Sequence, residues 1–266
     1  MEFPLYQIDA FTNKLFAGNA AGVVPLKAPL PDPVMQSIAL ENNLPETAFF
    51  FPEGEGYRLR WFSPTVEINL CGHATVATAF VISEYLERGK RAMSFETRSG
   101  RLGVEVKGDV FVLDFPARQI KPAIAPQVGE VLGKKPAEVI ESYSWLAVYD
   151  SAEDLASLKP DFAAMSKLDL FGVIATAPGR DGPGLDAIDY VCRFFAPKAG
   201  INEDPATGSA QCVLMPYWAQ RLGRKRLISR QISSRIGDFD CELAGERVKI
   251  GGRAVCYMKG SIAVAD

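Results

Sequence analysis

The chain has 266 residues, 48% of them hydrophobic, and a formal net charge of −3. This length permits one large domain or two smaller ones, and the hydrophobic content permits a substantial core. The slightly acidic balance argues against a nucleic-acid partner, and no apolar run is long enough to span a membrane. Five scattered cysteines and an amino-terminal segment without a signal-peptide pattern predict a reduced, cytoplasmic protein.

The first half begins with a strand, a helix and a second strand. Residues 3–9 alternate between apolar and polar and predict a strand, and residues 31–43 predict a helix. Residues 48–51, an alanine and three phenylalanines, predict a buried strand. Glu46 lies at the start of this strand, where burying a carboxylate is unfavourable unless it has hydrogen-bonding or ion-pair partners or a functional role. The alternative is that Glu46 caps a backbone group or pairs with an arginine such as Arg60.

A long apolar helix follows. Residues 73–88 are apolar on nearly all sides, which is typical of a helix at the centre of a domain. Strands are expected at 92–97 and 103–115. The segment 115–126 is rich in proline and lacks periodicity, so we interpret it as an interdomain linker. We therefore predict domains at 1–117 and 118–266, with the option that the last strand returns to the first domain.

The second half predicts a similar mixture of strands and helices. Its expected elements are short helices within 126–140, a strand near 143–149, a helical stretch near 151–165, a strand near 170–176, a glycine-rich loop at 179–184, a second apolar helix before Gly223, and short strands within 239–264. Both halves are thus expected to consist mainly of strands around one helix.

The second half also repeats the first in sequence. Residues 190–197 (YVCRFFAP) match residues 57–64 (YRLRWFSP) in kind at six positions, with an offset of 133 residues, half the chain length. Gly72 corresponds to Gly208 after an insertion of three residues. A repeat at half length predicts two domains related by a pseudo-two-fold axis, with a cleft between them. We expect an α+β fold in which each domain is a curved, largely antiparallel sheet wrapped around a central buried helix.

The two helix starts carry different side chains, residues 71–74 (CGHA) in the first half and residues 204–209 (DPATGS) in the second. Glycine lets a ligand approach the backbone, and the free N–H groups at a helix start favour an anion. A substrate carboxylate could therefore be held by donors from both starts. The alternative is that Asp204, Thr207 and Ser209 only cap their helix.

Several kinds of chemistry are absent from the sequence. His73 is the only histidine, and Cys71 lies two residues before it, but a structural zinc site needs about four ligands, so no metal is expected. The chain has no phosphate-binding loop, no dinucleotide fingerprint and no Gly-x-Ser-x-Gly motif around Ser209. Glu46, His73, Asp204 and Ser209 remain, a set that suits proton transfer without a cofactor.

These residues resemble the phenazine-biosynthesis PhzF family, within the diaminopimelate-epimerase-like fold. The resemblance depends on five stretches spread over the chain, residues 9–12, 18–19, 46–49, 70–75 and 203–210. It implies a homodimeric, cofactor-free isomerase, similar to the enzyme that isomerises trans-2,3-dihydro-3-hydroxyanthranilate by a proton shift.

The resemblance also implies roles for single residues. It places the acid/base glutamate on Glu46 and its supporting residues on His73, Asp204 and Ser209. Substrate-binding residues are expected at the two helix starts: Cys71, Gly72, Ala74, Thr207 and Gly208. The expected partner is a small-molecule carboxylate substrate, with no nucleic acid and no membrane.

Epimerases of the same fold use two cysteines, one at each helix start. Here Cys71 matches the first, but Pro205 stands where the second would be. One alternative is nevertheless an amino-acid racemase or epimerase in which Cys71 and Glu46 form an asymmetric acid/base pair. Another is a non-catalytic protein that binds a small molecule.

Overall fold

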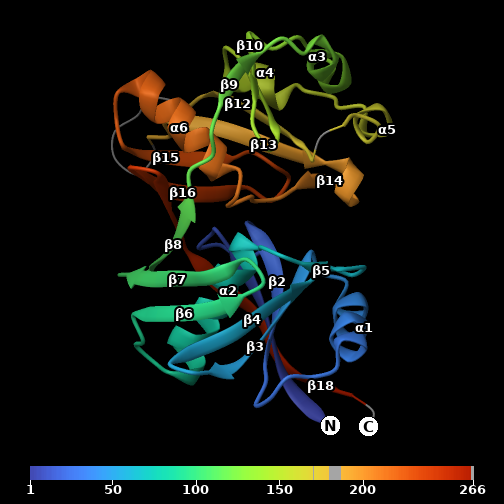
Figure 1. Cartoon of the computed structure of the whole chain (residues 1–266), viewed down its shortest axis with the longest axis vertical. Helices are drawn as coiled ribbons and strands as arrows, with labels where there is room; N and C mark the ends of the chain where they lie inside the picture. Colours follow the sequence, from blue (N-terminus) through green and yellow to red (C-terminus); the bar gives the residue numbers. More distant parts are fainter. Residues whose placement is uncertain (170, 180–186, 265–266) are drawn as a thin grey trace. The chain divides into compact units, whose positions relative to one another are not determined.

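The computed structural model describes residues 1–169, 171–179 and 187–264 (Figure 1), so most of the predicted loop at 179–184 lies outside the described residues. The chain divides into two compact units: unit 1 comprises residues 1–114 and the chain from Gly251 onward, and unit 2 comprises residues 115–250. The sequence analysis placed a boundary at 117/118, whereas the structure divides at 114/115 and 250/251. None of the described helices is long and apolar enough to cross a membrane.

Unit 1 contains one mostly antiparallel sheet. Its strands pair in the order β18–β1–β2–β3–β4–β6–β7–β8, and only β2–β3 and β4–β6 are parallel. The strands are β1 (Glu2–Ala10), β2 (Asn19–Pro25), β3 (Glu46–Glu53), β4 (Gly56–Phe62), β6 (Ala92–Thr97), β7 (Gly100–Lys107), β8 (Val110–Pro116) and β18 (Ala254–Ala263). A short strand, β5 (Glu67–Ile68), pairs with the end of β4.

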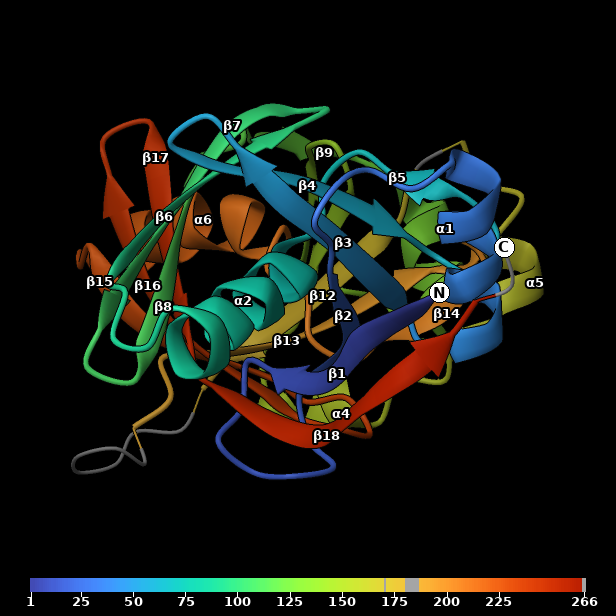
Figure 2. The ribbon, with the colours of Figure 1, turned by 90° about the horizontal axis from the view of Figure 1, so that it is seen from below.

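Helix α2 (Gly72–Val81) lies within the curve of this sheet (Figure 2) and packs against β1, β2 and β3. Every residue of α2 except Phe80 is buried, as its apolar sequence predicted. The helix continues into one π-helical turn, η1 (Ile82–Leu86). Helix α1 (Asp32–Asn42) packs on β3 and β4 through a separate apolar cluster. The prediction of a central buried helix is confirmed for this unit.

Unit 2 contains a second sheet, with strands paired in the order β9–β10–β11–β12–β13–β15–β16. Only β11–β12 and β13–β15 are parallel, and the short strand β14 pairs with β13. The strands are β9 (Lys121–Ala123), β10 (Glu138–Glu141), β11 (Trp145–Val148), β12 (Val173–Pro178), β13 (Tyr190–Ala196), β14 (Ile201–Asp204), β15 (Arg226–Gln231), β16 (Gly237–Ala244) and β17 (Arg247–Gly252).

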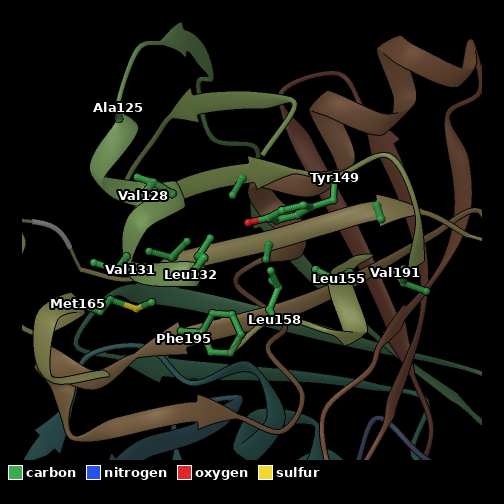
Figure 3. Packing of buried hydrophobic residues seen from close by; sticks show 14 of the residues in the cluster. Ala125, Val128, Val131, Leu132, Tyr149, Leu155, Leu158, Met165, Val191 and Phe195 are labelled. Atoms are coloured by element: carbon green, nitrogen blue, oxygen red, sulfur yellow. The ribbon is translucent and has the colours of Figure 1, made fainter. Parts of the chain in front are cut away.

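Helix α6 (Gln211–Leu222) packs on β15 and β16 of this sheet. Helices α3 (Pro126–Leu132), α4 (Ala152–Ala156) and α5 (Phe162–Met165), with the 3₁₀ turn η3 (Pro197–Ala199), complete the unit. Figure 3 shows the apolar cluster where side chains such as Leu132, Leu155 and Phe195 pack together. This cluster anchors the three short helices to β11, β12 and β13.

One secondary-structure prediction in unit 2 is wrong. The sequence predicted short helices through 126–140, but α3 ends at Leu132 and Glu138–Glu141 forms strand β10. Gly133 ends α3 in the left-handed conformation, with φ of 74°, which glycine adopts without strain. Pairing with β9 and β11 then holds the following segment extended, and no local pattern in the sequence indicates that pairing.

The two sheets share one pairing scheme. In unit 1 the pairs from β1 to β7 are antiparallel, parallel, antiparallel, parallel and antiparallel, and the pairs from β10 to β16 follow the same sequence in unit 2. In each unit the second parallel connection contains a short strand and the central helix, as a parallel crossover requires. The repeat found in the sequence is therefore a repeat of topology, and the predicted α+β fold is confirmed.

A proline inside α6 leaves one helix carbonyl without its usual hydrogen-bond donor, and a residue outside the helix supplies the donor instead. Pro216 has no N–H, so the carbonyl of Cys212, four residues earlier, lacks its usual helix donor. The backbone N–H of Arg118 donates to that carbonyl at 2.9 Å. The chain that enters unit 2 is thereby tied to the first turns of α6.

Candidate functional site

Glu46 is the first residue of β3, and its side chain is more than nine-tenths buried. Its carboxylate oxygen Oε2 lies 2.9 Å from Nε2 of His73. The two atoms form a histidine–carboxylate ion pair when His73 is protonated, and no other described residue donates a hydrogen bond to Oε2. A buried carboxylate whose partner is a single histidine is uncommon in proteins, and one explanation of such a carboxylate is a catalytic role.

The alternative partner for Glu46 is wrong. Arg60 forms a two-pronged ion pair with Glu67, with nitrogen–oxygen distances of 2.8 and 2.7 Å. A third guanidinium nitrogen donates to Asp32 at 2.7 Å. Arg60 is therefore fully engaged elsewhere, and the described residue that approaches Glu46 with a charge is His73.

His73 is the second residue of α2, and its Nδ1 lies 3.6 Å from Sγ of Cys71. Burial disfavours the imidazolium form, but the neighbouring Cys71 and Glu46 outweigh it and raise the pKa of His73 well above its usual value. Burial, together with the charge of Glu46, raises the pKa of the Cys71 thiol. These directions favour a positively charged His73 beside Glu46 at neutral pH.

The backbone at the start of α2 adds donors to this group. Cys71 is the N-cap residue, with an extended backbone and no capping hydrogen bond from its side chain. The N–H groups of Gly72 and His73 donate to no other described residue, as is usual in the first turn of a helix. Two free donors and the positive end of the helix dipole suit a bound carboxylate.

In unit 2, Asp204 is the last residue of β14 and lies opposite Phe194 of β13. The hydroxyl of Thr207 donates to its carboxylate, and the N–H of Thr207 donates to Oε1 of Gln231 at 2.8 Å. Gln231 donates in turn to the carbonyl of Asp204 at 2.6 Å. Thr207 was expected to bind substrate, and the structure shows it and Gln231 fixing the position of Asp204.

Ser209 has a partner that the sequence analysis missed. Tyr143 lies between β10 and β11, and its hydroxyl donates to Oγ of Ser209 at 3.3 Å. Burial raises the pKa of Tyr143 to about 12, so it remains a donor at neutral pH. The guanidinium of Arg118 lies 5.5 Å from the centre of the Tyr143 ring. A single tyrosine in a connecting segment has no motif around it, so nothing in the sequence indicated this contact.

The capping alternative for the second helix start is also wrong. Helix α6 begins at Gln211, its N-cap residue is Ala210, and no side chain caps it. Asp204, Thr207 and Ser209 therefore have other roles. Gly208 precedes this first turn, and the N–H groups of Gly208 and Ser209 donate to no other described residue.

The predicted site residues form two groups, one in each unit. In unit 1, ligand atoms of Glu46, Cys71 and His73 lie within 4.8 Å of one another, with Gly72 and Ala74 in the same helix turn. In unit 2, Asp204, Thr207, Gly208 and Ser209 lie along one segment that leads into α6. The group in unit 1 combines a buried carboxylate with an adjacent imidazole, and both kinds of side chain serve as general acids or bases in enzymes.

Comparison with known proteins confirms the resemblance found in the sequence. The family described as "Phenazine biosynthesis-like protein" (PhzC-PhzF) matches residues 8–260. An uncharacterised isomerase of Pseudomonas aeruginosa is 46% identical over 263 residues, which cover 98% of this chain and 99% of that protein.

Solved structures agree with this assignment. A PhzF-family phenazine biosynthesis protein of Enterococcus faecalis aligns with a TM-score of 0.91 at 43% identity, covering 99% of this chain and 100% of that one. A hydroxyproline epimerase of Agrobacterium vitis aligns with a TM-score of 0.58 at 13% identity, over 100% of this chain and 93% of that one, which shows a likeness of fold alone. This chain belongs to the family of phenazine biosynthesis-like proteins.

Proposed function

We propose that this protein is an isomerase that moves a proton within a small carboxylate-bearing substrate, by general acid/base catalysis and without a cofactor. Membership of the family supports the reaction class, because several relatives are named isomerases. The observation that carries the mechanism is the Oε2 atom of Glu46, which is buried, lies 2.9 Å from Nε2 of His73 and receives no hydrogen bond from any other described residue.

Glu46 acts as both base and acid in this mechanism. A proton shift between two carbons of one substrate needs a group that returns the proton it has taken. The free oxygen of Glu46 accepts the proton from the first carbon, and the resulting carboxylic acid donates it to the second. His73, held as a cation, stabilises the carboxylate form before and after the transfer. The free N–H groups of Gly72 and His73 bind the carboxylate of the substrate.

The residues of unit 2 complete the proposal. Asp204 and Ser209, with Gly208, serve the same reaction, as the resemblance to the PhzF family implies. Thr207 and Gln231 support this by fixing Asp204, and Tyr143 supports it by orienting the hydroxyl of Ser209. The resemblance also leads us to propose a cytoplasmic homodimer, which light scattering coupled to gel filtration would test by giving twice the mass of one chain.

A labelling experiment in deuterated water tests the proposed activity. Pooled small carboxylates are incubated with the protein, and mass spectrometry identifies any compound that gains deuterium. The wild type and the matched control Glu53→Gln should label the same compound, because Glu53 lies at the exposed end of the same strand. Glu46→Gln should abolish the labelling. Undiminished labelling by Glu46→Gln would show that another group moves the proton.

A specific observation also keeps the epimerase alternative open. Sγ of Cys71 lies 3.6 Å from the ring of His73, close enough for the two to exchange a proton through a small movement. The raised pKa of Cys71 weighs against this alternative, because the thiol is a weak base in that state. Inactivation by a thiol reagent, prevented by substrate, would favour the epimerase. A ligand that binds without any exchange of solvent protons would instead favour a non-catalytic binding protein.

A further inference from the structure

Three side chains of different chemistry converge in unit 1. Sγ of Cys71 lies 3.6 Å from Nδ1 and 3.9 Å from Nε2 of His73, and Nε2 lies 2.9 Å from Oε2 of Glu46. All three ligand atoms lie within 4.8 Å of one another. Zinc–sulfur bonds of about 2.3 Å and zinc–nitrogen or zinc–oxygen bonds of about 2.0–2.2 Å place neighbouring tetrahedral ligands roughly 3.3–3.6 Å apart. Small side-chain movements would therefore suffice to surround an ion.

The sequence predicted no metal because Cys71 and His73 were the only candidate ligands that lie close together in the chain. The fold adds a third ligand, since β3 brings Glu46 to the start of α2. Three protein ligands with a fourth position open to water form the usual set of a reactive zinc site, in contrast to the closed four-ligand set of a structural site.

The state of Glu46 independently points to a ligand. Its side chain is more than nine-tenths buried, and its Oε2 receives no hydrogen bond from any described residue other than His73. A thiolate at Cys71 and a carboxylate at Glu46 would together carry two negative charges, which match one divalent cation.

We propose that Glu46, Cys71 and His73 bind one thiophilic divalent cation of the zinc class, as a reversible inhibitor and not as a resident cofactor. The cation displaces the proton of the Cys71 thiol, and the proton of His73 where the ring is charged, and water fills the fourth position. The metal site does not depend on the proposed function; only the inhibition does, because the ion would occupy the oxygen that is proposed to accept the proton.

Cobalt(II) is a suitable probe, since a cobalt–thiolate bond absorbs in the near ultraviolet. The metal-free full-length protein is titrated with Co²⁺, and Zn²⁺ is then added as a competitor. We expect one equivalent to bind with thiolate-to-cobalt absorption that Zn²⁺ removes. Cys71→Ser should lose this absorption, and Glu46→Gln should keep it while the affinity falls by about tenfold or more. The control Cys256→Ser should behave as the wild type, because Cys256 is the one cysteine that is only partly buried and lies outside the cluster.

Three results would overturn the proposal: no binding of a stoichiometric ion by the wild type, unchanged absorption in Cys71→Ser, or lost absorption in Cys256→Ser. Should Cys71→Ser fail to fold, methylthiolation of the wild type decides the question. Zn²⁺ should protect Cys71 and not Cys256 from the reagent, as mapped by mass spectrometry, and equal labelling of Cys71 with and without Zn²⁺ would contradict the site.

The inhibition is measured separately with the compound found in the deuterium experiment. Zn²⁺ should lower its labelling by the wild type, and a chelator should restore it. Labelling that is unaffected at saturating Zn²⁺ would contradict the inhibition and leave the spectroscopic result standing. Absent labelling without any metal would instead count against the proposed function, so the two failures are distinguishable.

Discussion

The starts of α2 and α6 follow the same kind of hairpin but present different side chains. In unit 1, β4 and β5 form the hairpin, and Arg60 pairs with Glu67 across it while its guanidinium lies 5.1 Å from the centre of the Phe62 ring. In unit 2, β13 and β14 form the hairpin, and a corresponding pair supports it. Arg193 binds Glu203 at 2.8 and 2.9 Å and lies 4.9 Å from the Phe195 ring.

Although the two hairpins are supported alike, the side chains at the helix starts that follow them differ. The start of α2 has a cysteine, a histidine and a nearby glutamate, whereas the start of α6 has a serine oriented by Tyr143 and an aspartate fixed by Thr207. Backbone N–H groups need no particular side chain, so both starts keep free donors. The comparison shows that the repeated framework presents free backbone donors twice, while the proton transfer that we propose depends on side chains found in one copy only.

Replacing Glu46 by glutamine is the strongest way to test this division. The amide keeps the size of the side chain but cannot accept the proton, so we expect turnover to fall by at least about 10²-fold with ligand binding retained. Steady-state kinetics on the labelled compound measure the effect, and Glu53→Gln should leave turnover unchanged. Near-normal turnover in Glu46→Gln would remove the proposed chemistry from the start of α2.

The two arginine–glutamate pairs can be compared by their contribution to stability. Glu67 also binds Arg98 at 2.6 Å, and its side chain is 10% exposed against 23% for Glu203. We expect Glu67→Gln to lower the free energy of unfolding by about 2–3 kcal/mol and Glu203→Gln by about 1–2 kcal/mol, the range for hydrogen bonds to charged groups. Denaturant titration measures both. The exposed pair of Glu96 with Arg101 provides the control, and Glu96→Gln should change stability by less than about 0.5 kcal/mol.

Ser209→Ala tests the contribution of unit 2. The loss of one hydroxyl that binds a charged substrate should lower kcat/KM by about tenfold, which corresponds to the weaker end of such hydrogen bonds. The control Ser157→Ala, at an exposed position after α4, should have no effect. A loss as large as that in Glu46→Gln would mean that the second helix start takes part in the proton transfer itself.

Cys71→Ala should have a smaller effect. Because its thiol has a raised pKa and Pro205 occupies the position of a second cysteine, we expect activity within about tenfold of the wild type, a barrier change below about 1.4 kcal/mol. Kinetics and a folding check by circular dichroism decide the matter. If activity falls by several orders of magnitude in a folded variant, the epimerase alternative replaces the isomerase.

The pH dependence of stability should be the mildest effect. The pKa of His73 is raised in the folded protein, so its charged form contributes stability that is fully present below its unfolded pKa of about 6.5 and is lost as the pH rises through the folded pKa. The difference in unfolding free energy between the wild type and His73→Gln should therefore be largest near pH 6 and shrink at higher pH. A difference that grows with pH would show that His73 is held neutral.

The sequence by itself determined the plan of the fold and the positions of the candidate residues. The repeated stretches at 57–64 and 190–197 indicated two similar halves, and the apolar surface of residues 73–88 predicted a helix at the centre of the first. Both signals are local, since they depend on residues that follow one another in one element. Cys71 and His73 could be paired for the same reason, because they lie within one turn.

The tertiary structure alone decided which of these residues meet and in what state. Strand register and sheet curvature bring Glu46 close to His73 and pair Arg60 with Glu67. They also bring the hydroxyl of Tyr143 within hydrogen-bonding distance of Ser209 and pair Glu138–Glu141 as a strand. Such contacts join elements that are separate in the chain, and periodicity within an element carries no information about its partner. The pairing of the buried Glu46 with His73, which supports both the proposed catalysis and the proposed metal site, joins a strand to a helix that lies 26 residues or more later in the chain, and sequence periodicity does not indicate it.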